Sequence, residues 1–364
     1  MVSSKIGYTA PFAVHPGETI KDTIEMLDMK QADLGVRTSL SEKTISEIIN
    51  GREPITPETA LKFERVLGVS QGLLVNMQAQ YEADVVRLNE KSKLEKEAEM
   101  LSAFSCYSEL VKLGYLKPVK NKAEKVEELL RFFAVDSLGL VEDVMPVAFR
   151  RGIKPNVNKN SLAAWLRIGK IRAINKDIPE FDRETLSKNV EKMRQLTIEN
   201  PKIYSQKLVE FCAESGVVLT YTPHLKNTFM NGAVMWLSAT RALIHLSILN
   251  KYADIFWFTL FHEIGHILRH SKKLSFVDFE GIKNTSEMEL EADKFAERVL
   301  IPNEFESEYL KLKELITPLS VRQEINQFAK KINIDPGIIA GRVGREKKMW
   351  KYVVPLRKKL GFID

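Results

Sequence analysis

The chain has 364 residues, of which 44% are hydrophobic and 28% are charged, and it carries a formal net charge of +6. This composition is typical of a globular protein with two or three domains, and without a run of about 18 apolar residues or a signal-peptide start we expect neither a membrane span nor secretion. The two cysteines, Cys106 and Cys212, are far apart, which argues against a disulfide framework or a zinc knuckle and predicts a cytoplasmic protein.

Residues 10–80 are predicted to form a compact domain of short helices, because apolar residues recur there with helical spacing. After a first helix, a second begins near Gln31. Ser41 can cap a third helix, which turns its isoleucines inward and ends at Gly51. A fourth helix begins at Pro57, since proline is favoured in the first helical turn.

The outward face of the third helix carries small, amide and charged side chains, which can approach base edges in the major groove. Polar residues beside it can hold phosphates. The segment as a whole is slightly acidic, which weakens non-specific attraction to DNA, so a bundle used only for protein contacts is the alternative. The candidate DNA-binding residues are Gln31, Ser41, Lys43, Thr44, Ser46, Glu47, Asn50 and Arg52.

This segment also carries four motifs in order: HPGE, Q-x-x-L, T-I-S-x-I-x-N-G and P-I-T-P-E-T-A-L. Over some 65 residues it resembles the Cro/C1-type (XRE) helix-turn-helix of HigA-type antitoxins. Two departures stand out: Ser39 occupies a turn position usually held by Gly, and Gly35 replaces the usual Ala, at a cost to the helix of up to about 1 kcal/mol. The resemblance implies a five-helix fold, and we expect a homodimer on a palindromic double-stranded DNA operator. A toxin partner is compatible with it.

Residues 81–202 are predicted to be a helical connector. Its first part is highly charged with sparse apolar residues, which indicates a partly exposed helix, and the apolar repeat is too short to predict a coiled coil. Amphipathic helical segments follow at residues 125–141, 161–173 and 181–197. The basic residues Arg150, Arg151 and Lys154 are best interpreted as part of a solvated loop.

Residues 203–345 are predicted to form a second domain with a short sheet. A helix at 207–216 leads into three segments of strand character, at 216–222, 230–237 and 241–248. We expect a small antiparallel sheet packed on the following helix, so the fold class of the whole chain is mainly α (α+β), with a zincin-like C-terminal domain. Residues 346–364 are expected to be a basic, solvated tail.

The pattern H-E-x-x-H occurs once, as His262, Glu263 and His266, in a strongly apolar segment. Residues four apart share a helix face, so both imidazoles can bind one metal ion. Zn²⁺ fits them, because imidazole nitrogens bind zinc at about 2.0–2.1 Å and a catalytic site adds a third protein ligand and a water. Glu263 can then act as the general base for the metal-bound water.

The third ligand is expected on a second helix, EMELEADKFAERVL, which can turn back across the first. His270 is a poor candidate, because each four-residue step rises about 6 Å along the helix. Glu289 is favoured as the ligand over Glu291. Asp293, four residues after Glu289, can hydrogen-bond the outer nitrogen of a ligand histidine.

The segments FTLFHEIGHILRH, ELEADKFA and LIP, with INIDPGIIAGRVGRE near the end, resemble the ImmA/IrrE family of metallopeptidases over roughly residues 205–345. The resemblance implies zinc binding by His262, His266 and Glu289 and catalysis by Glu263. An XRE helix-turn-helix joined to such a domain is a known arrangement, and several relatives cleave a repressor.

The sequence thus predicts a DNA-binding transcriptional regulator with a zinc-dependent endopeptidase domain that cleaves a repressor or antitoxin protein. The alternative is a HigA-like antitoxin or repressor whose peptidase-like domain is a non-catalytic sensor or docking module. Peptide hydrolysis also needs a group that stabilises the oxyanion. The candidates are His224, Tyr221, Tyr252 and His245, although the apolar strand around His245 favours a structural role for that residue.

Overall fold

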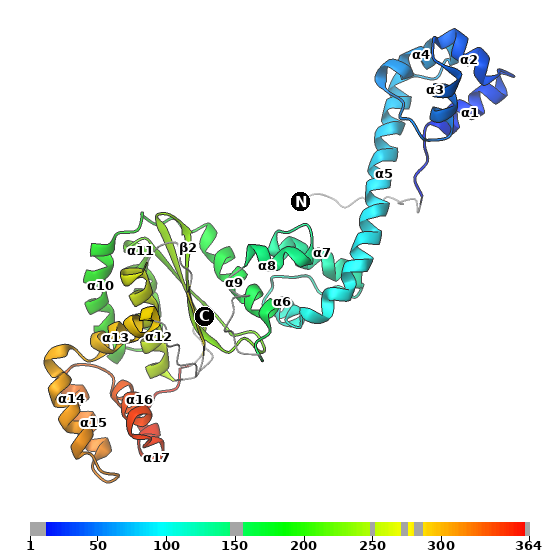
Figure 1. The fold of residues 1–364 in the computed structure, drawn as a ribbon. Coiled ribbons are helices and arrows are strands. Elements are labelled where there is room, and N and C mark those ends of the chain that lie inside the picture. Colours follow the sequence, from blue (N-terminus) through cyan, green and yellow to red (C-terminus); the bar gives the residue numbers. More distant parts are fainter. Residues whose placement is uncertain (1–11, 146–155, 248–251, 271–275, 280–286, 361–364) are drawn as a thin grey trace. The chain divides into compact units, whose positions relative to one another are not determined.

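The computed structural model describes residues 12–145, 156–247, 252–270, 276–279 and 287–360 (Figure 1). The chain divides into two compact units, Met1–Glu99 with Lys120–Glu127 and Met100–Val119 with Glu128–Asp364. The expected basic loop at Arg150, Arg151 and Lys154 lies outside the described residues.

The first unit contains the five helices expected from the sequence. They are α1 (Gly17–Met26), α2 (Gln31–Thr38), α3 (Glu42–Ile49), α4 (Pro57–Leu67) and α5 (Gln71–Glu97). Ser41 caps α3 as predicted, since its side chain accepts a hydrogen bond from the Thr44 backbone N–H at 3.0 Å. The core that joins the helices is apolar and buried, and includes Ile20, Leu34, Ile45, Ile48, Phe63 and Leu74.

Helix α5 has 27 residues and passes through residue 80, where the sequence analysis set a domain boundary. At 1.5 Å per residue it is about 40 Å long. Leu74, in its first turn, is fully buried in the core of the first unit. The helix-turn-helix core and the start of the expected connector therefore share one continuous helix.

The second unit combines helices with one small sheet. Its helical elements before the sheet are α6 (Tyr107–Lys112), the end of α7 (Lys122–Phe133), α8 (Val141–Val144), α9 (Lys159–Ile174), α10 (Arg183–Gln195) and α11 (Pro201–Glu214). Those after the first three strands are α12 (Ala253–Arg269), α13 (Glu287–Leu300), α14 (Asn303–Leu315), α15 (Val321–Lys331), α16 (Pro336–Lys347) and α17 (Trp350–Val353). The short 3-10 helices are η1 (Ala98–Ala103), η2 (Leu138–Leu140), η4 (Leu196–Ile198) and η5 (Val354–Leu356).

The sheet is mixed, which corrects the expected antiparallel sheet. Its strands are β1 (Val217–Thr222), β2 (Met230–Ser238), β3 (Arg241–Ser247) and β4 (Phe276–Phe279), in the order β1-β3-β2-β4. β2 pairs antiparallel with both β3 and β4, whereas β1 and β3 are parallel. The β2–β3 hairpin inserts β3 between β2 and β1, so the first and third strands of the chain become neighbours that run the same way. The sequence analysis did not predict β4.

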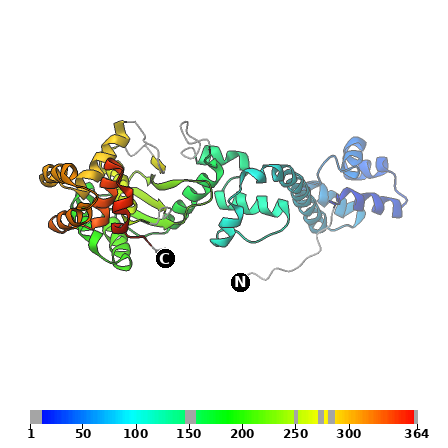
Figure 2. The same cartoon turned by 90° about the horizontal axis from the view of Figure 1, so that it is seen from below.

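Helices cover both faces of the sheet. On one face, His245 of β3 lies against α9, where its ring centroid is 3.9 Å from that of Trp165. On the other face, residues such as Val234, Ile244 and Leu246 join the core that contains α12. Figures 1 and 2 both place α12 and the orange and red helices α14–α17 on this second side. Helices α9 and α10 lie within the segment 81–202 that was expected to be a connector, and α11 crosses its end. All three belong to the same compact unit as the sheet.

The basic C-terminal segment is folded rather than a solvated tail, as far as residue 360. Arg357 lies 2.9 Å from the Asp254 carboxylate, and both side chains are less than one-tenth exposed. Tyr252 and Lys359 form an isolated antiparallel bridge. A cationic partner stabilises a buried carboxylate, so the pair with Asp254, at the start of α12, ties Arg357 to the helix that carries His262.

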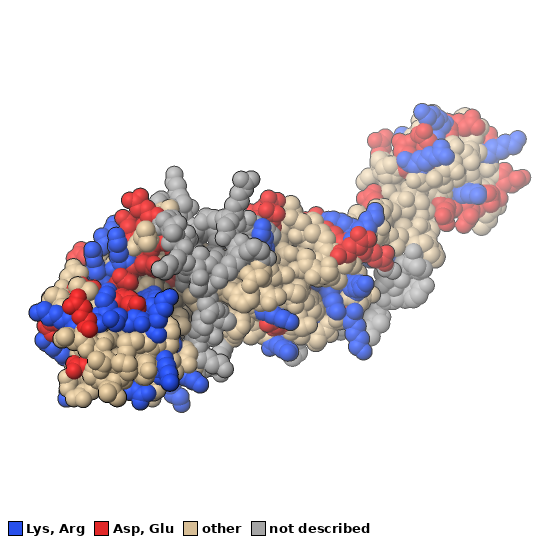
Figure 3. Space-filling view, turned by 60° about the horizontal axis from the view of Figure 1, so that its bottom comes forward, with Lys and Arg blue, Asp and Glu red and all other residues tan. Residues whose placement is uncertain are grey.

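The surface visible in Figure 3 carries charge of both signs, with Lys or Arg and Asp or Glu on each unit. Both cysteines, Cys106 and Cys212, are buried and free. Among the described residues, none of the helices combines the length and the apolar character needed to cross a bilayer.

Candidate metal centre and helix-turn-helix

The two histidines of the H-E-x-x-H pattern face each other on α12. The Nε2 atoms of His262 and His266 are 3.0 Å apart, and both residues are at most 3% exposed. They lie one helical turn apart in a strongly apolar helix, which is buried by the sheet on one side and by α13 on the other. The helix therefore presents two imidazole nitrogens to one point.

Helix α13 brings a carboxylate to the same point. Glu289 Oε2 lies 3.2 Å from His262 Nε2 and 3.5 Å from His266 Nε2. The approach of the two helices depends on Gly265, because a Cβ there would lie 3.2 Å from the Ala292 Cα. His262, His266 and Glu289 form a buried group whose donor atoms all lie within 4.8 Å of one another.

The outer nitrogens of both histidines have hydrogen-bond partners. His262 Nδ1 lies 2.9 Å from Asp293 Oδ1, the contact that the sequence analysis proposed for Asp293. His266 Nδ1 lies 2.9 Å from His270 Nδ1, and His270 Nε2 lies 3.1 Å from Glu291 Oε2. The structure thus places Glu291, the alternative ligand, beside His270 rather than in the three-residue group.

These contacts fit a metal ion with two imidazole ligands and one carboxylate ligand. Because Asp293 and His270 occupy the two Nδ1 atoms, the two Nε2 atoms remain to face Glu289. A ligand histidine that donates its other nitrogen to a carboxylate or similar partner is the usual arrangement at protein zinc sites. Two nitrogens and one oxygen are also a donor set that Zn²⁺ accepts in catalytic sites.

The charge state of Glu289 suits this arrangement. Burial disfavours its carboxylate, but the hydrogen bonds from His262 and His266 outweigh burial and lower the pKa of Glu289 to about 2. Burial also lowers the pKa of His266. A charged carboxylate and a neutral imidazole are the forms that bind a metal ion.

Glu263 is fully buried on α12 beside the three-residue group. Its carboxylate lies against Gly232 of β2, where an added Cβ would come within 2.6 Å of Glu263 Oε1. The sheet therefore leaves room for this side chain only because residue 232 has none. Sequence reasoning identified Glu263 from its motif but not the glycine opposite it.

The four candidates for oxyanion stabilisation lie in different surroundings. His224 is exposed in the loop after β1. Tyr221 of β1 packs against Phe256 in the core, and Tyr252 lies under the Arg357 guanidinium, 3.9 Å from it.

His245 is the fourth of these candidates. It is fully buried, and burial, with a smaller effect of the Arg172 charge, lowers its pKa to about 3. Its Nδ1 lies 2.7 Å from Thr220 Oγ1, which fits a structural role.

In the first unit, α2 and α3 form the helix-turn-helix pair, and the candidate DNA-binding residues lie on its surface. Ser41, Lys43, Asn50 and Arg52 are exposed, and Gln31, Thr44, Ser46 and Glu47 are half-buried. The turn between the helices uses Ser39 in the left-handed region, at φ 55°. Gly35, on α2, lies close to this turn: a Cβ at residue 35 would come within 2.9 Å of the Leu40 carbonyl oxygen, so glycine fits this position.

Together, the fold and the site define a protein with a helix-turn-helix unit and a unit built around an H-E-x-x-H helix. Comparison with family models agrees with both parts: residues 20–70 match the helix-turn-helix family, and residues 231–333 match the IrrE N-terminal-like domain of the M78 peptidases. The chain therefore carries an XRE-type helix-turn-helix at its N-terminus and an IrrE/ImmA-like domain at its C-terminus.

Several solved structures are similar to part of the chain. One, from Nostoc punctiforme, is assigned as an antidote protein of a plasmid maintenance system; the match has 30% identity, covers 23% of this chain and 93% of that one, and has a TM-score of 0.23. An addiction module antidote protein of the HigA family from Coxiella burnetii matches with 27% identity. The match covers 23% of this chain and 94% of that one, with a TM-score of 0.22. The antitoxin HigA of Pseudomonas aeruginosa, solved with the higBA promoter, matches with 22% identity. The match covers 23% of this chain and 92% of that one, with a TM-score of 0.22. A comparison with curated proteins gives no match.

Proposed function

We propose that this chain is a DNA-binding transcriptional regulator whose C-terminal domain is a zinc-dependent endopeptidase. The observation that carries the proposal is the meeting of His262 Nε2, His266 Nε2 and Glu289 Oε2 beside the buried carboxylate of Glu263. A domain that only senses a ligand or docks a partner needs no such carboxylate. The match to the M78 peptidases supports the same reaction class.

In this proposal His262, His266 and Glu289 are the ligands of Zn²⁺, which when bound lowers the pKa of water and polarises a peptide carbonyl. Asp293 and His270 hold the imidazole rings in orientation through their Nδ1 atoms. Glu263 accepts the proton of the attacking water and passes it to the departing amine of the peptide. The apolar surroundings of α12 exclude bulk water from this carboxylate, which is fully buried.

The DNA-binding part of the proposal rests on the helix-turn-helix family match and on the exposed face of α3. Lys43 and Asn50 on or beside this helix would reach base edges, and Arg52 would contact a phosphate. We expect a homodimer on a palindromic operator, since two copies of one helix read two half-sites. A repressor or antitoxin is the proposed protein substrate, and a toxin is a second proposed partner.

The first test is the metal content of the purified chain. We expect about one zinc ion per wild-type chain, the stoichiometry of a single-zinc site with three protein ligands. The variants His262→Ala and Glu289→Ala should lose it, whereas Glu263→Gln should keep it and lose cleavage. A metal-replete wild-type chain without zinc would contradict the peptidase and leave a DNA-binding regulator with a repurposed domain.

DNA binding is tested separately by selection from a random duplex library. Lys43→Ala and Arg52→Ala should weaken binding to the selected sequence, and loss of a phosphate contact should reduce the salt dependence by roughly one unit of slope. Lys62→Ala, on α4 and paired with Glu58, is the control. Selection of no sequence would favour the alternative in which the helical unit makes only protein contacts.

A further inference from the structure

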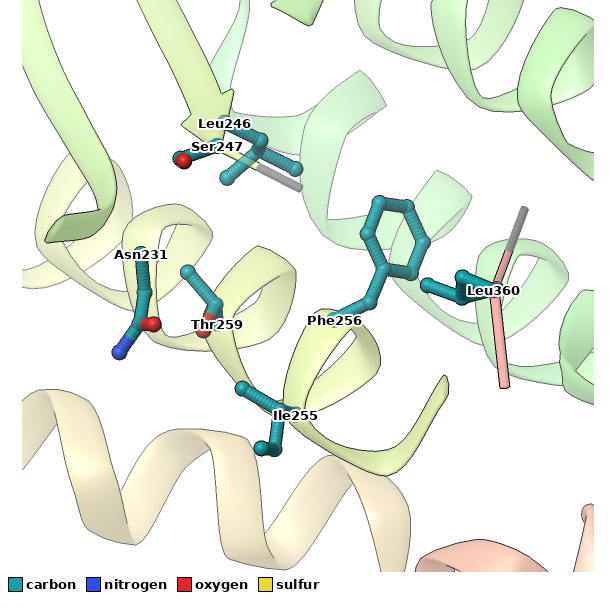
Figure 4. A pocket seen from close by; sticks show the side chains of 7 residues that line it. All are labelled: Asn231, Leu246, Ser247, Ile255, Phe256, Thr259 and Leu360. Carbon is teal, nitrogen blue, oxygen red and sulfur yellow. The ribbon is translucent and has the colours of Figure 1, made fainter. Parts of the chain in front are cut away.

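A small cavity lies beside the N-terminal half of α12 (Figure 4). Ile255 and Thr259 line it from α12, and Leu246 lines it from β3. Because residues four apart lie on one side of a helix, Ile255, Thr259 and Glu263 follow one another along α12. The complete lining consists of Asn231, Leu246, Ser247, Ile255, Phe256, Thr259 and Leu360.

Two walls of the cavity, Thr259 and Leu246, lie close to Gly232, the residue that faces Glu263. A Cβ built on Gly232 would lie 2.6 Å from Glu263 Oε1, 2.9 Å from Thr259 Cγ2 and 3.0 Å from Leu246 Cδ2. One glycine therefore touches both the proposed general base and two walls of the cavity. Consecutive residues of an extended peptide are about 3.3 Å apart, so a peptide whose scissile bond lies at Glu263 can reach the cavity with a neighbouring side chain.

The size and chemistry of the cavity limit what it can hold. Its volume of about 10 Å³ is close to the minimum for one water molecule, and a methyl or hydroxyl group is of similar size. None of the seven lining residues is charged, so a charged side chain there would be buried without a counter-ion. Asn231, Ser247 and Thr259 supply polar atoms beside the apolar walls formed by Leu246 and Ile255.

We infer that this cavity is a substrate subsite that admits only a small, uncharged side chain, that of Gly, Ala or Ser, at one residue flanking the scissile bond. This inference rests on the proposed endopeptidase function and adds the substrate class to it. Ile255 and Leu246 set the size limit, because their side chains close the space next to Thr259.

The test is digestion of a proteome-derived peptide mixture by the zinc-loaded full chain, with the cut sites identified by mass spectrometry. Wild type should show Gly, Ala and Ser enriched at one position next to the cut. Ile255→Ala enlarges the cavity, so cleavage next to Val or Leu should rise roughly tenfold relative to cleavage next to Ala, the effect of one or more methylene groups in an apolar pocket. Ile255 is half-buried, and Ile255→Val repeats the test with a smaller change if the alanine variant loses its zinc.

Ile171→Ala is the matched control, because Ile171 is also half-buried but lies on α9. It should keep the wild-type cut-site profile. Cleavage without a preference for small residues, or an unchanged profile in both Ile255 variants, would overturn the subsite while leaving the peptidase in place. A zinc-loaded wild-type chain that cuts no peptide in the mixture would instead overturn the proposed function and the subsite with it.

Discussion

Gly232 illustrates how a residue without a side chain can determine where a neighbouring side chain lies. Its Cα faces Glu263 from the neighbouring strand, and no other residue type leaves that space open. We expect Gly232→Ala to displace the carboxylate and reduce peptide cleavage by roughly 100-fold, because catalytic groups misplaced by about 1 Å lose that much. Zinc content should stay at the wild-type level, measured on the same samples. Full activity in this variant would contradict the role given to Glu263.

His270 and Glu291 form a hydrogen-bonded chain that ends at His266. Removing His270 frees the His266 ring to rotate, so His270→Ala should weaken zinc affinity by roughly 10- to 100-fold, as other partners of ligand histidines do. Glu291→Gln should have a smaller effect in the same direction. Competition with a fluorescent chelator measures the affinity of each variant.

The two substitutions act through one chain of contacts, so their effects should not add in the double variant. Glu297→Gln is the matched control on the same helix, since Glu297 is half-buried and lies two turns beyond Glu289. Equal affinity in His270→Ala and wild type would show that the Nδ1 contact of His266 is dispensable.

At this scale the sequence predicts the part of the site that follows from spacing along a helix. His262 and His266 are four apart, and so are Glu289 and Asp293, which places each pair on one face. The contact of His270 with Glu291 depends on how α12 and α13 cross, and Gly232 lies on a separate strand. Neither arrangement can be derived from spacing within one helix.

Among the elements, α3 is a helix whose start is determined by its local sequence. Ser41 accepts a hydrogen bond from the Thr44 N–H and also contacts the Thr44 hydroxyl. Ser41→Ala should therefore reduce the free energy of unfolding of the first unit by about 1 kcal/mol, the usual contribution of an N-cap. Chemical denaturation followed by circular dichroism measures this change.

Ser70 provides the comparison for this prediction. It occupies the N-cap position of α5 but makes no capping hydrogen bond through its side chain. Ser70→Ala should leave the stability close to that of wild type. A similar loss in both variants would mean that the Ser41 cap has no special contribution.

Helix positions could be predicted because apolar spacing and caps are local, whereas the sheet order and the C-terminal segment could not. Strand-like segments reveal where strands lie and how long they are, but the parallel pairing of β1 with β3 arises because β3 lies between β1 and β2. The C-terminal segment looks solvated because it is basic. It packs through Arg357, which forms a buried ion pair with Asp254, a carboxylate about a hundred residues earlier.

At the scale of the whole molecule, the two compact units predict that metal removal acts on one of them. The proposed ligands His262, His266 and Glu289 all belong to the second unit. Anything that binds only the folded state stabilises it, by about 4 kcal/mol when the free ligand exceeds its Kd a thousandfold. Calorimetry with and without a chelator should therefore show two transitions, of which only one moves to lower temperature.

The two transitions can be assigned by repeating the scan with Ser41→Ala. This substitution should lower only the transition temperature of the first unit, the one that the chelator leaves unchanged. Operator binding should also survive chelation. A single transition that moves with zinc would contradict independent units and would imply that metal binding and DNA binding are coupled through the chain.

The two cysteines are buried and are not among the proposed ligands, and this has a consequence for oxidative stress. Burial raises the pKa of Cys106 to about 11 and that of Cys212 to about 12, so neither is present as the thiolate that reacts with peroxide. The proposed ligands are nitrogen and oxygen atoms, which peroxide does not convert as it converts a thiolate ligand. A metal centre with these proposed ligands would keep its ion under oxidising conditions, whereas sites built from cysteine release theirs.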